Sequence, residues 1–403
     1  MIKVPYAQAV HGQEEIDAVV DVLKTSTQMG KSVDAMEKRI ATMFDKKYGL
    51  LTNSGSSALY LAVEAAELPR GSEVITAALT FATTVAPIIR GGLVPVFVDA
   101  EKDTLNVNAS RIEDFITKRT SAIWIPNLLG NVPDWDIIRE LANRYNLFVL
   151  EDSADTLGST LRGSPTGARA DMSITSFYGS HIINCAGNGG WLGIDDEEKE
   201  RKARLLRSWG RTSSIITDIA QSESLENRLN VEVDGIPYDA KFIFEELGFQ
   251  MEPSEIGAAY GLVQLSKFAE IKKTRVKAFK RMEAIFSKHL DHIRLCKSNP
   301  DADLVWMHFP FIIKDDAPFS RRDLQIYFEE RGIQTRPPFA GNVMRQPMLK
   351  GQKFLAPDDS YENSDDVMKN GILLGCHQGL VEDQFAHVEE VAEKFFSSVL
   401  RMS

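Results

Sequence analysis

Residues 121–152 read SAIWIPNLLGNVPDWDIIRELANRYNLFVLED. The runs SAIWIP and LFVLED at the two ends are short, apolar and rich in residues that favour strands. The stretch WDIIRELANRY between them repeats its apolar residues at helical spacing. A helix between two strands is typical of a mainly parallel sheet with helices on both faces, and this is the fold class that the stretch predicts.

The same alternation extends through the first 200 residues. Helical spacing recurs in residues 12–25, 33–44 and 56–68, and further strand-like runs lie at 48–52, 73–77, 94–99 and 172–177. We therefore predict an α/β fold. In such sheets ligands bind beyond the carboxyl ends of the strands, so polar residues at those ends are candidates for a functional site.

The second half of the chain has a different pattern. Residues 212–240 are polar and irregular, which predicts a long loop or insertion, and a long helical stretch follows from Pro253 to His289. A smaller α/β domain then has a strand-like run at 304–313 and helices near 319–331, 361–370 and 381–400. The predicted division is a large domain over residues 1–250 and a linking helix with a small domain over residues 251–403.

The composition restricts the classes of protein to which the chain can belong. Of its 403 residues, 43% are hydrophobic and 26% are charged, and the net charge of −11 comes without a Lys/Arg-rich run. A nucleic-acid partner is therefore not expected. No apolar run approaches the ~20 residues that span a bilayer. Residues 1–10 lack the pattern of a signal peptide, so we expect a cytoplasmic protein without a membrane partner.

The three cysteines, Cys185, Cys296 and Cys376, lie far apart and form no CxxC pair. Their number and spacing predict neither a disulfide framework nor a zinc site. An iron–sulfur cluster usually takes four cysteine ligands, so no cluster is expected in one chain.

Three polar segments follow predicted strands. In TNSGSSA, residues 52–58, Gly55 would let the backbone approach an anion at the start of a helix, although an ordinary turn with a serine cap fits equally well. Asp152 ends the run LFVLED and could pair with a protonated pyridine nitrogen or serve as a cap. Phe81 follows another strand and could stack on a cofactor ring or belong to the core.

His181 closes the string SFYGSH, residues 176–181, and the glycine-rich GNGG follows at 187–190. A lone histidine is usually structural or on the surface, and this interpretation holds for His11, His289, His292, His308 and His387. His181 differs because a strand end, Ser-Phe and a glycine-rich turn all lie close to it. An imidazole, with an unperturbed pKa near ~6.5, is a competent general base.

The order of these segments resembles a known family. The chain resembles the DegT/StrS family of nucleotide-sugar aminotransferases in an ordered set of motifs. They are SGSSA, TFATT, NLLGN, EDSAD, SFYGSH and GNGG, followed by LGFQMEPSEIGAAYGLVQL. The resemblance covers nearly the whole chain. It implies the fold type I aminotransferase architecture with a mainly parallel seven-stranded sheet, a pyridoxal phosphate (PLP) cofactor, and a homodimer with shared active sites.

The family has a lysine, which carries PLP covalently, where this chain has His181. Within the family this exchange marks the sugar 3-dehydratases, which remove the 3-hydroxyl of nucleotide-linked 4-keto-6-deoxyhexoses. RPPFAGN at 336–342 and GCHQ at 375–378 also look like substrate-site motifs of that branch. The resemblance implies catalysis by His181 as acid and base, and substrate contacts by Arg336, Asn342 and His377.

The branch has two kinds of enzyme. One holds an iron–sulfur cluster with clustered cysteines and has a reductase partner, and the other uses glutamate to generate pyridoxamine phosphate (PMP). The loop WGRTSS…IPYDAKF, residues 209–242, resembles the first kind but has no cysteine, so we infer glutamate as the amino donor. Two alternatives stay open: a sugar aminotransferase with an unusual base, and an inactive fold that senses PLP or a nucleotide sugar.

The resemblance also implies the cofactor contacts. They are Gly55, Ser56, Ser57 and Ser176 at the phosphate, Phe81 at the ring face and Asp152 at the pyridine nitrogen. Gln250 stands where the family has an asparagine that reaches the phosphate from the neighbouring subunit. Asp155 stands where glutamine or another neutral residue is common, and the sequence gives no physical account of it.

Overall fold

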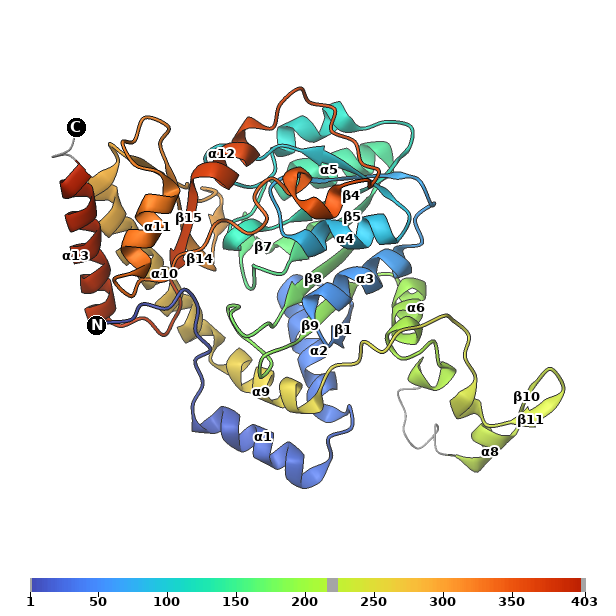
Figure 1. Ribbon diagram of the computed structural model, residues 1–403. Helices are drawn as coiled ribbons and strands as arrows, with labels where there is room; N and C mark the ends of the chain where they lie inside the picture. The colour runs from blue at the N-terminus through green and yellow to red at the C-terminus, as the bar shows by residue number, and fades with distance from the viewer. Residues whose placement is uncertain (1, 216–223, 400–403) are drawn as a thin grey trace.

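The computed structural model describes residues 2–215 and 224–399 (Figure 1). Its central sheet has seven strands in the order β1-β9-β8-β5-β4-β2-β3. They are β1 (Tyr48–Thr52), β2 (Glu73–Ala77), β3 (Val94–Val98), β4 (Thr120–Pro126), β5 (Phe148–Ser153), β8 (Met172–Ser176) and β9 (Gly190–Ile194). Within this sheet only β9 runs antiparallel to its neighbours, which confirms the predicted mainly parallel sheet.

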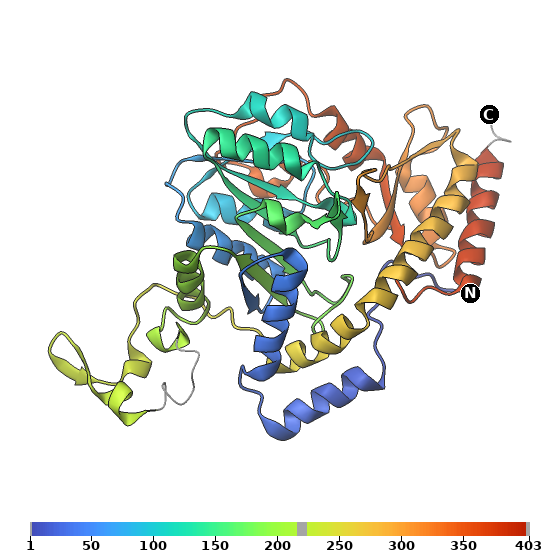
Figure 2. The same cartoon turned by 180° about the vertical axis from the view of Figure 1, so that it is seen from behind.

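Helices lie on both faces of this sheet, as Figures 1 and 2 show from opposite sides. Successive side chains of a strand point to opposite faces, so Leu150 of β5 packs with one layer and Val149 with the other. The helices of this part are α1 (Gln13–Thr25), α2 (Lys31–Phe44), α3 (Gly55–Ala66), α4 (Ala82–Arg90), α5 (Trp135–Tyr145) and α6 (Glu197–Arg207). Leu150 lies in one apolar cluster with α3 and α6, and Val149 lies in another with α5.

The strand pattern does not predict β9, because GWLGI contains two glycines and follows a glycine-rich turn directly. The structure explains those glycines through Trp191, whose side chain is fully buried. A Cβ on Gly193, or on Gly49 of the paired strand β1, would collide with the Trp191 indole. The small residues therefore make room for the large one that fills this part of the core.

The stretch from Pro253 to His289 is helical as predicted, but it is not one continuous helix. It forms two helices, α9 (Glu255–Ser266) and α10 (Phe268–Phe286), that meet at Lys267. Lys267 departs from ideal helical angles (φ −93°, ψ 0°) while staying in the right-handed region, and its ammonium is held by Glu14 and Glu15 of α1. The bend lets α9 pack on α1 and α2 while α10 continues into the C-terminal part.

The C-terminal part has an antiparallel sheet in the order β12-β14-β15. Its elements are β12 (Ile293–Leu295), β14 (His308–Ile313), β15 (Gly371–Gly375), α11 (Arg321–Glu329), α12 (Glu362–Asn370) and α13 (Glu382–Val399). A further small sheet joins β13 (Ala302–Asp303) to β6 (Thr160–Leu161) and β7 (Ser164–Pro165). The division into two domains at residue 250 stays a prediction.

Residues 2–10, called here the N-terminal strap, cross to the C-terminal part. Val4 forms a backbone bridge with Ile333, and the Tyr6 N–H donates to Gln334 Oε1 (3.0 Å). The strap thus brings Tyr6 next to residues more than 300 positions later in the chain.

Residues 225–249, called here the arm, extend away from the body of the molecule (Figure 1). The arm contains α8 (Leu225–Leu229), β10 (Val231–Val233) and β11 (Ile236–Tyr238), so the predicted insertion over residues 212–240 holds a short helix and a hairpin. Residues 216–223 of that prediction lie outside the described residues. Across the part of the chain that is described, no helix combines the length and the apolar character needed to cross a membrane.

Candidate active site

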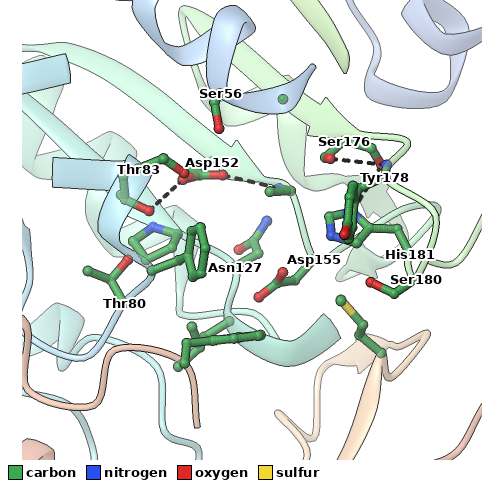
Figure 3. A pocket seen from close by; sticks show the side chains of 18 of the residues that line it. Ser56, Thr80, Thr83, Asn127, Asp152, Asp155, Ser176, Tyr178, Ser180 and His181 are labelled. Atoms are coloured by element: carbon green, nitrogen blue, oxygen red, sulfur yellow. Dashed lines mark hydrogen bonds between the residues drawn. The ribbon is translucent and has the colours of Figure 1, made fainter. Parts of the chain in front are cut away.

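A cavity of about 520 Å³ lies at the carboxyl ends of the central strands (Figure 3). Its wall combines the turn after β1, the start of α4 and the segments after β4, β5 and β8 with residues of the C-terminal part. Parallel α/β sheets bind ligands at this edge, and it is the edge at which the sequence predicts the site.

The turn after β1 forms one end of the cavity. Ser54 caps α3 by accepting a hydrogen bond from the Ser57 N–H (3.1 Å). The N–H groups of Gly55 and Ser56 have no acceptor among the described residues, and both residues line the cavity together with Ser176. Free N–H groups and the positive end of the helix dipole attract an anion, so the turn fits a phosphate.

Gly55→Ala should weaken cofactor binding, because the new Cβ would lie 2.7 Å from Ser176 Cβ and 3.0 Å from its hydroxyl. Crowding of this kind costs ~1–3 kcal/mol, so we expect a roughly 5- to 150-fold loss of affinity for PLP. Titration of the PLP absorbance against each protein measures it. Gly12→Ala is the control, because its Cβ would meet only Glu15 Oε2 at 3.9 Å. Equal PLP affinity in both variants would contradict a phosphate site at Gly55.

The two neighbouring carboxylates at the end of β5 point in different directions. Glu151 faces away from the cavity and accepts hydrogen bonds from Asn127, Ser153, Thr166 and Ser173. Asp152 lines the cavity and accepts from the Thr84 hydroxyl (2.8 Å) and the Ala154 N–H (3.1 Å). The alternation of strand side chains therefore separates a structural carboxylate from one that is available to a ligand.

Asp152 is buried, and no cation within the described residues compensates its charge. Burial raises its pKa to about 6, although its hydrogen bonds from Thr84 and Ala154 act in the opposite sense. A positive group placed against this carboxylate would lower the pKa and restore the charge. The arrangement fits a protonated pyridine nitrogen, which is the partner predicted for Asp152.

Phe81 precedes α4, lines the cavity and has 51% of its surface exposed. Its ring meets Phe339 edge to face, with the centroids 5.9 Å apart. An aromatic ring that is supported at its edge and exposed on a face can stack on a flat ligand. The exposure favours the predicted ring contact over the alternative in which Phe81 is a core residue.

His181 lies in the loop after β8, which is closed by a hydrogen bond from the Gly179 N–H to the Gly187 carbonyl (2.9 Å). His181 Nδ1 lies 3.2 Å from the Ser176 carbonyl. A carbonyl only accepts, so Nδ1 carries the proton and Nε2 keeps its lone pair. Burial lowers the pKa of His181 to about 4, so the imidazole is neutral near pH 7 and can act as a base.

Asp155 lies between Asp152 and His181 in the view of Figure 3. Its Oδ2 accepts from the Leu129 N–H (3.2 Å), and burial, with the nearby charge of Asp152, raises its pKa to about 7. A protonated carboxyl can donate a hydrogen bond and a charged one only accepts. The structure thus gives a physical account of this position: a group that can change between donor and acceptor near neutral pH.

The wall contributed by the C-terminal part is mostly absent from the sequence-based predictions. Tyr6 of the N-terminal strap stacks on His308 of β14, with the ring centroids 4.0 Å apart, and the Arg336 guanidinium lies 5.5 Å from the Tyr6 ring. Phe339 completes this wall. The sequence predicts a substrate contact for Arg336, interprets His308 as structural or on the surface, and has no pattern that marks Tyr6.

Ser57 and Gln250 do not line the cavity of this chain. The Ser57 hydroxyl donates to Asn53 Oδ1 (2.6 Å), so its proton is engaged in a hydrogen bond within the turn. Gln250 forms a backbone bridge with Ser208 at the base of the arm. Its predicted contact is with the phosphate of a neighbouring subunit, and that contact stays a prediction.

Asn342 and His377, predicted as substrate contacts, also lie outside the cavity wall. Asn342 donates to Asp365 Oδ1 (2.8 Å) and accepts from the Met344 N–H (3.1 Å). His377 Nδ1 accepts from the Gly379 N–H (3.2 Å), so Nε2 donates to the Pro5 carbonyl (3.1 Å). Asn342 holds the segment around it and His377 holds the N-terminal strap, and their predicted roles gain no support from this geometry.

Known proteins match nearly the whole chain. The DegT/DnrJ/EryC1/StrS aminotransferase family model matches residues 10–394. The lipopolysaccharide biosynthesis protein RfbH of Salmonella typhimurium is 32% identical over 98% of this chain and 92% of its own. The dTDP-4-dehydro-2,6-dideoxy-D-glucose 3-dehydratase of Saccharopolyspora spinosa is 32% identical over 97% of this chain and 86% of its own.

A solved structure gives a similar result. GDP-4-keto-6-deoxymannose-3-dehydratase with a trapped PLP-glutamate geminal diamine superposes with a TM-score of 0.86, at 27% identity, over 96% of this chain and 99% of that chain. The family model covers both the sheet that carries the cavity and the C-terminal part that closes it. The chain therefore belongs to the DegT/DnrJ/EryC1/StrS aminotransferase family.

Proposed function

We propose that the protein is a PLP- and PMP-dependent 3-dehydratase that removes the C3 hydroxyl of a nucleotide-linked 4-keto-6-deoxyhexose. The observation that carries the proposal is His181, a buried and neutral imidazole on the cavity wall that stands where the family has a lysine. Imidazole can move protons but cannot supply the amine that carries PLP covalently. Two similar proteins named as 3-dehydratases support the same reaction.

The residues on the cavity wall divide the work of holding the cofactor. The N-terminus of α3 and Ser176 would bind its phosphate, Phe81 its ring face and Asp152 its pyridine nitrogen. Bound PMP supplies an amine for the C4 ketone and a pyridinium that takes up electrons. The charge of Asp152 keeps that nitrogen protonated.

His181 serves two proton transfers. With the cofactor bound, its Nε2 would accept a proton from C4′, the carbon that bears the amine, and the imidazolium would then donate a proton to the departing C3 hydroxyl. Burial lowers the pKa of His181 to about 4, so the imidazolium is a strong acid when the hydroxyl leaves. One side chain can therefore act as base and then as acid on the same face of the substrate.

Glutamate is the proposed amino donor. The chain has three cysteines, fewer than the four ligands that an iron–sulfur cluster usually takes, and all three are free and buried. A similar dehydratase has been solved with a trapped PLP-glutamate geminal diamine. Arg336 offers a guanidinium on the cavity wall to the anionic groups of glutamate or of the nucleotide sugar.

The proposal is tested by incubating the protein with PLP, glutamate and a panel of nucleotide-linked 4-keto-6-deoxyhexoses, followed by mass spectrometry. A sugar that has lost one oxygen, with 2-oxoglutarate and ammonia, is the expected result. A sugar with a new amine would instead establish an aminotransferase. Tight cofactor binding without turnover of any sugar would favour a sensing role.

Two chains are proposed to form a cytoplasmic homodimer with shared active sites. The arm exposes a set of large apolar side chains: Leu225, Ile236, Phe242, Phe244 and Leu247. A concentration of large, exposed apolar side chains on one segment supports an interaction site there. Gln250 follows the arm and lies away from the cavity of its own chain, as the predicted contact with a partner's phosphate requires.

Leu247→Glu together with Phe244→Glu is expected to give an inactive monomer. Leu247 is 96% exposed, so the change should disturb the interface and leave the fold of one chain intact. Analytical ultracentrifugation gives the mass and circular dichroism checks the fold. Leu290→Glu, an exposed position at the end of the α10 region, is the control and should stay dimeric. An active dimer of the double variant would refute this role of the arm.

A further inference from the structure

Arg275 is a buried arginine for which no carboxylate among the described residues lies within ion-pair distance. It lies on α10, is 1% exposed, and donates to the carbonyls of Trp306 (3.3 Å) and Met307 (2.7 Å) and to Gln378 Oε1 (2.6 Å). All three acceptors are neutral. Burial of a charge with neutral partners is unfavourable, and an apolar side chain of similar size would pack at lower cost. Arg275 therefore needs an explanation other than packing.

A chain of hydrogen bonds leads from Arg275 to the loop that carries the candidate base. Gln378, just beyond β15, accepts from Arg275 and donates through Nε2 to the Ile182 carbonyl (3.3 Å). Ile182 directly follows His181. The backbone hydrogen bonds around His181, such as that from its own N–H to the Tyr178 carbonyl (2.9 Å), stay within the loop. Gln378 thus ties this loop to the C-terminal part.

The charge of Arg275 also acts on three imidazoles around it. Burial is the main cause that lowers the pKa values of His181, His308 and His377, and the positive charge of Arg275 lowers each of them further. The other titratable groups on the walls around His181 are Tyr6, Asp152, Asp155, Tyr178, His308 and Arg336. A fixed cation on one side of the imidazole opposes its protonation.

We propose that Arg275 and Gln378 are positioning residues for His181: Arg275 holds the Gln378 amide, Gln378 fixes the loop of His181 through Ile182, and the charge of Arg275 adds to the burial that keeps the imidazole neutral. The inference rests on the proposed function, in which neutral His181 is the base. It adds that the position and the neutral state of the base are set by residues of the C-terminal part that do not line the cavity.

The first test measures the protonation of His181 directly. Protein with isotope-labelled histidine rings is titrated by NMR, and the His181 signals are identified by their loss in His181→Asn. Arg275→Met should move the titration of His181 to higher pH by at least ~0.5 pH unit, because a nearby positive charge is removed. Arg275→Lys, which keeps the charge, and Gln378→Leu should leave it unchanged. An unmoved titration in Arg275→Met would overturn the electrostatic role.

The second test separates position from charge by kinetics. Gln378→Leu should lower kcat about tenfold with KM and the acidic limb of the pH profile unchanged, because a small displacement of the base slows proton transfer. Arg275→Met should shift the acidic limb upward, and Arg275→Lys should restore its position. Unchanged kcat in Gln378→Leu would overturn the positioning role.

Arg321→Met is the matched control for both tests. Arg321 is another arginine of the C-terminal part; it is part-buried, donates to the Met368 carbonyl, and within the described residues forms no hydrogen bond or ion pair with the loop of His181. It should behave as the wild type. If Arg275→Met fails to fold, Arg275→Lys and Gln378→Leu still decide the positioning role. The NMR result does not depend on which reaction the protein catalyses, so failure of this inference and failure of the proposed function are distinguishable.

Discussion

His181→Asn is expected to lower kcat by at least ~10³-fold while the affinity for PMP changes little. Asparagine can still bond to the Ser176 carbonyl, which lies 3.2 Å from His181 Nδ1, but an amide cannot accept a proton near neutral pH. General acid–base groups contribute ~10²–10⁴-fold, and here one residue serves two transfers. The dehydration rate is measured by mass spectrometry, and PMP affinity by the change in cofactor absorbance.

His387→Asn is the control for this variant. His387 Nε2 lies 2.7 Å from the Arg331 carbonyl, far in sequence from the loop of His181, and His387 does not line the cavity. It should retain the activity of the wild type. If His181→Asn turns over at the rate of the wild type, the proton transfers belong to another group and the dehydratase mechanism proposed for this chain is wrong.

Asp152→Asn is expected to lower kcat by about 10³-fold and, in addition, to raise the stability of the cofactor-free protein above pH 6. The first effect follows because a neutral amide does not hold the pyridine nitrogen protonated, which weakens the electron sink. The second follows from burial, which raises the pKa of Asp152 to about 6. Activity assays and thermal unfolding at pH 5 and pH 8 measure the two effects.

The sign of the stability effect comes from proton binding. Between pH ~4 and pH 6 the folded protein keeps a proton on Asp152 that the unfolded chain has lost, so stability falls as pH rises through this window. Above pH 6 the buried charge costs about 3 kcal/mol, and asparagine removes that cost. Glu151→Gln is the control, because Glu151 sits in a network of four donors and should lose stability instead. A lower Tm for Asp152→Asn at pH 8 would contradict the argument.

The sequence predicts much of the fold because most elements form local patterns. The apolar runs of β1 to β5 and of β8 are bounded by turns, and α5 has its apolar residues on one side, so their spacing is visible without the structure. The bend at Lys267 is not visible, because it depends on Glu14 and Glu15 more than 250 positions earlier. The strand β9 is not predicted for a similar reason, because the space that the Trp191 indole needs beside Gly193 is seen only in the structure.

The same distinction applies to the candidate site. Asp152, Ser176 and His181 lie at the ends of predicted strands, and topology alone brings them to one edge of the sheet. Tyr6 and His308 reach the site, and Arg275 the loop behind it, through tertiary contacts between distant segments, and nothing in the neighbouring sequence marks them. Ser57 and Asn342 show the converse: residues in suggestive motifs whose side chains form hydrogen bonds within their own turns.

The N-terminal strap has a consequence for the order in which the protein can mature on the ribosome. Val4 pairs with Ile333 and the Pro5 carbonyl with His377, and at ~5–20 residues per second translation needs roughly 15 to 65 s to proceed from residue 4 to residue 333. During that interval the strap lacks its backbone partner at residue 333, and the cavity wall that holds Tyr6 is incomplete. A chain whose translation stops before residue 333 would therefore lack the contacts that hold Tyr6 in the cavity wall.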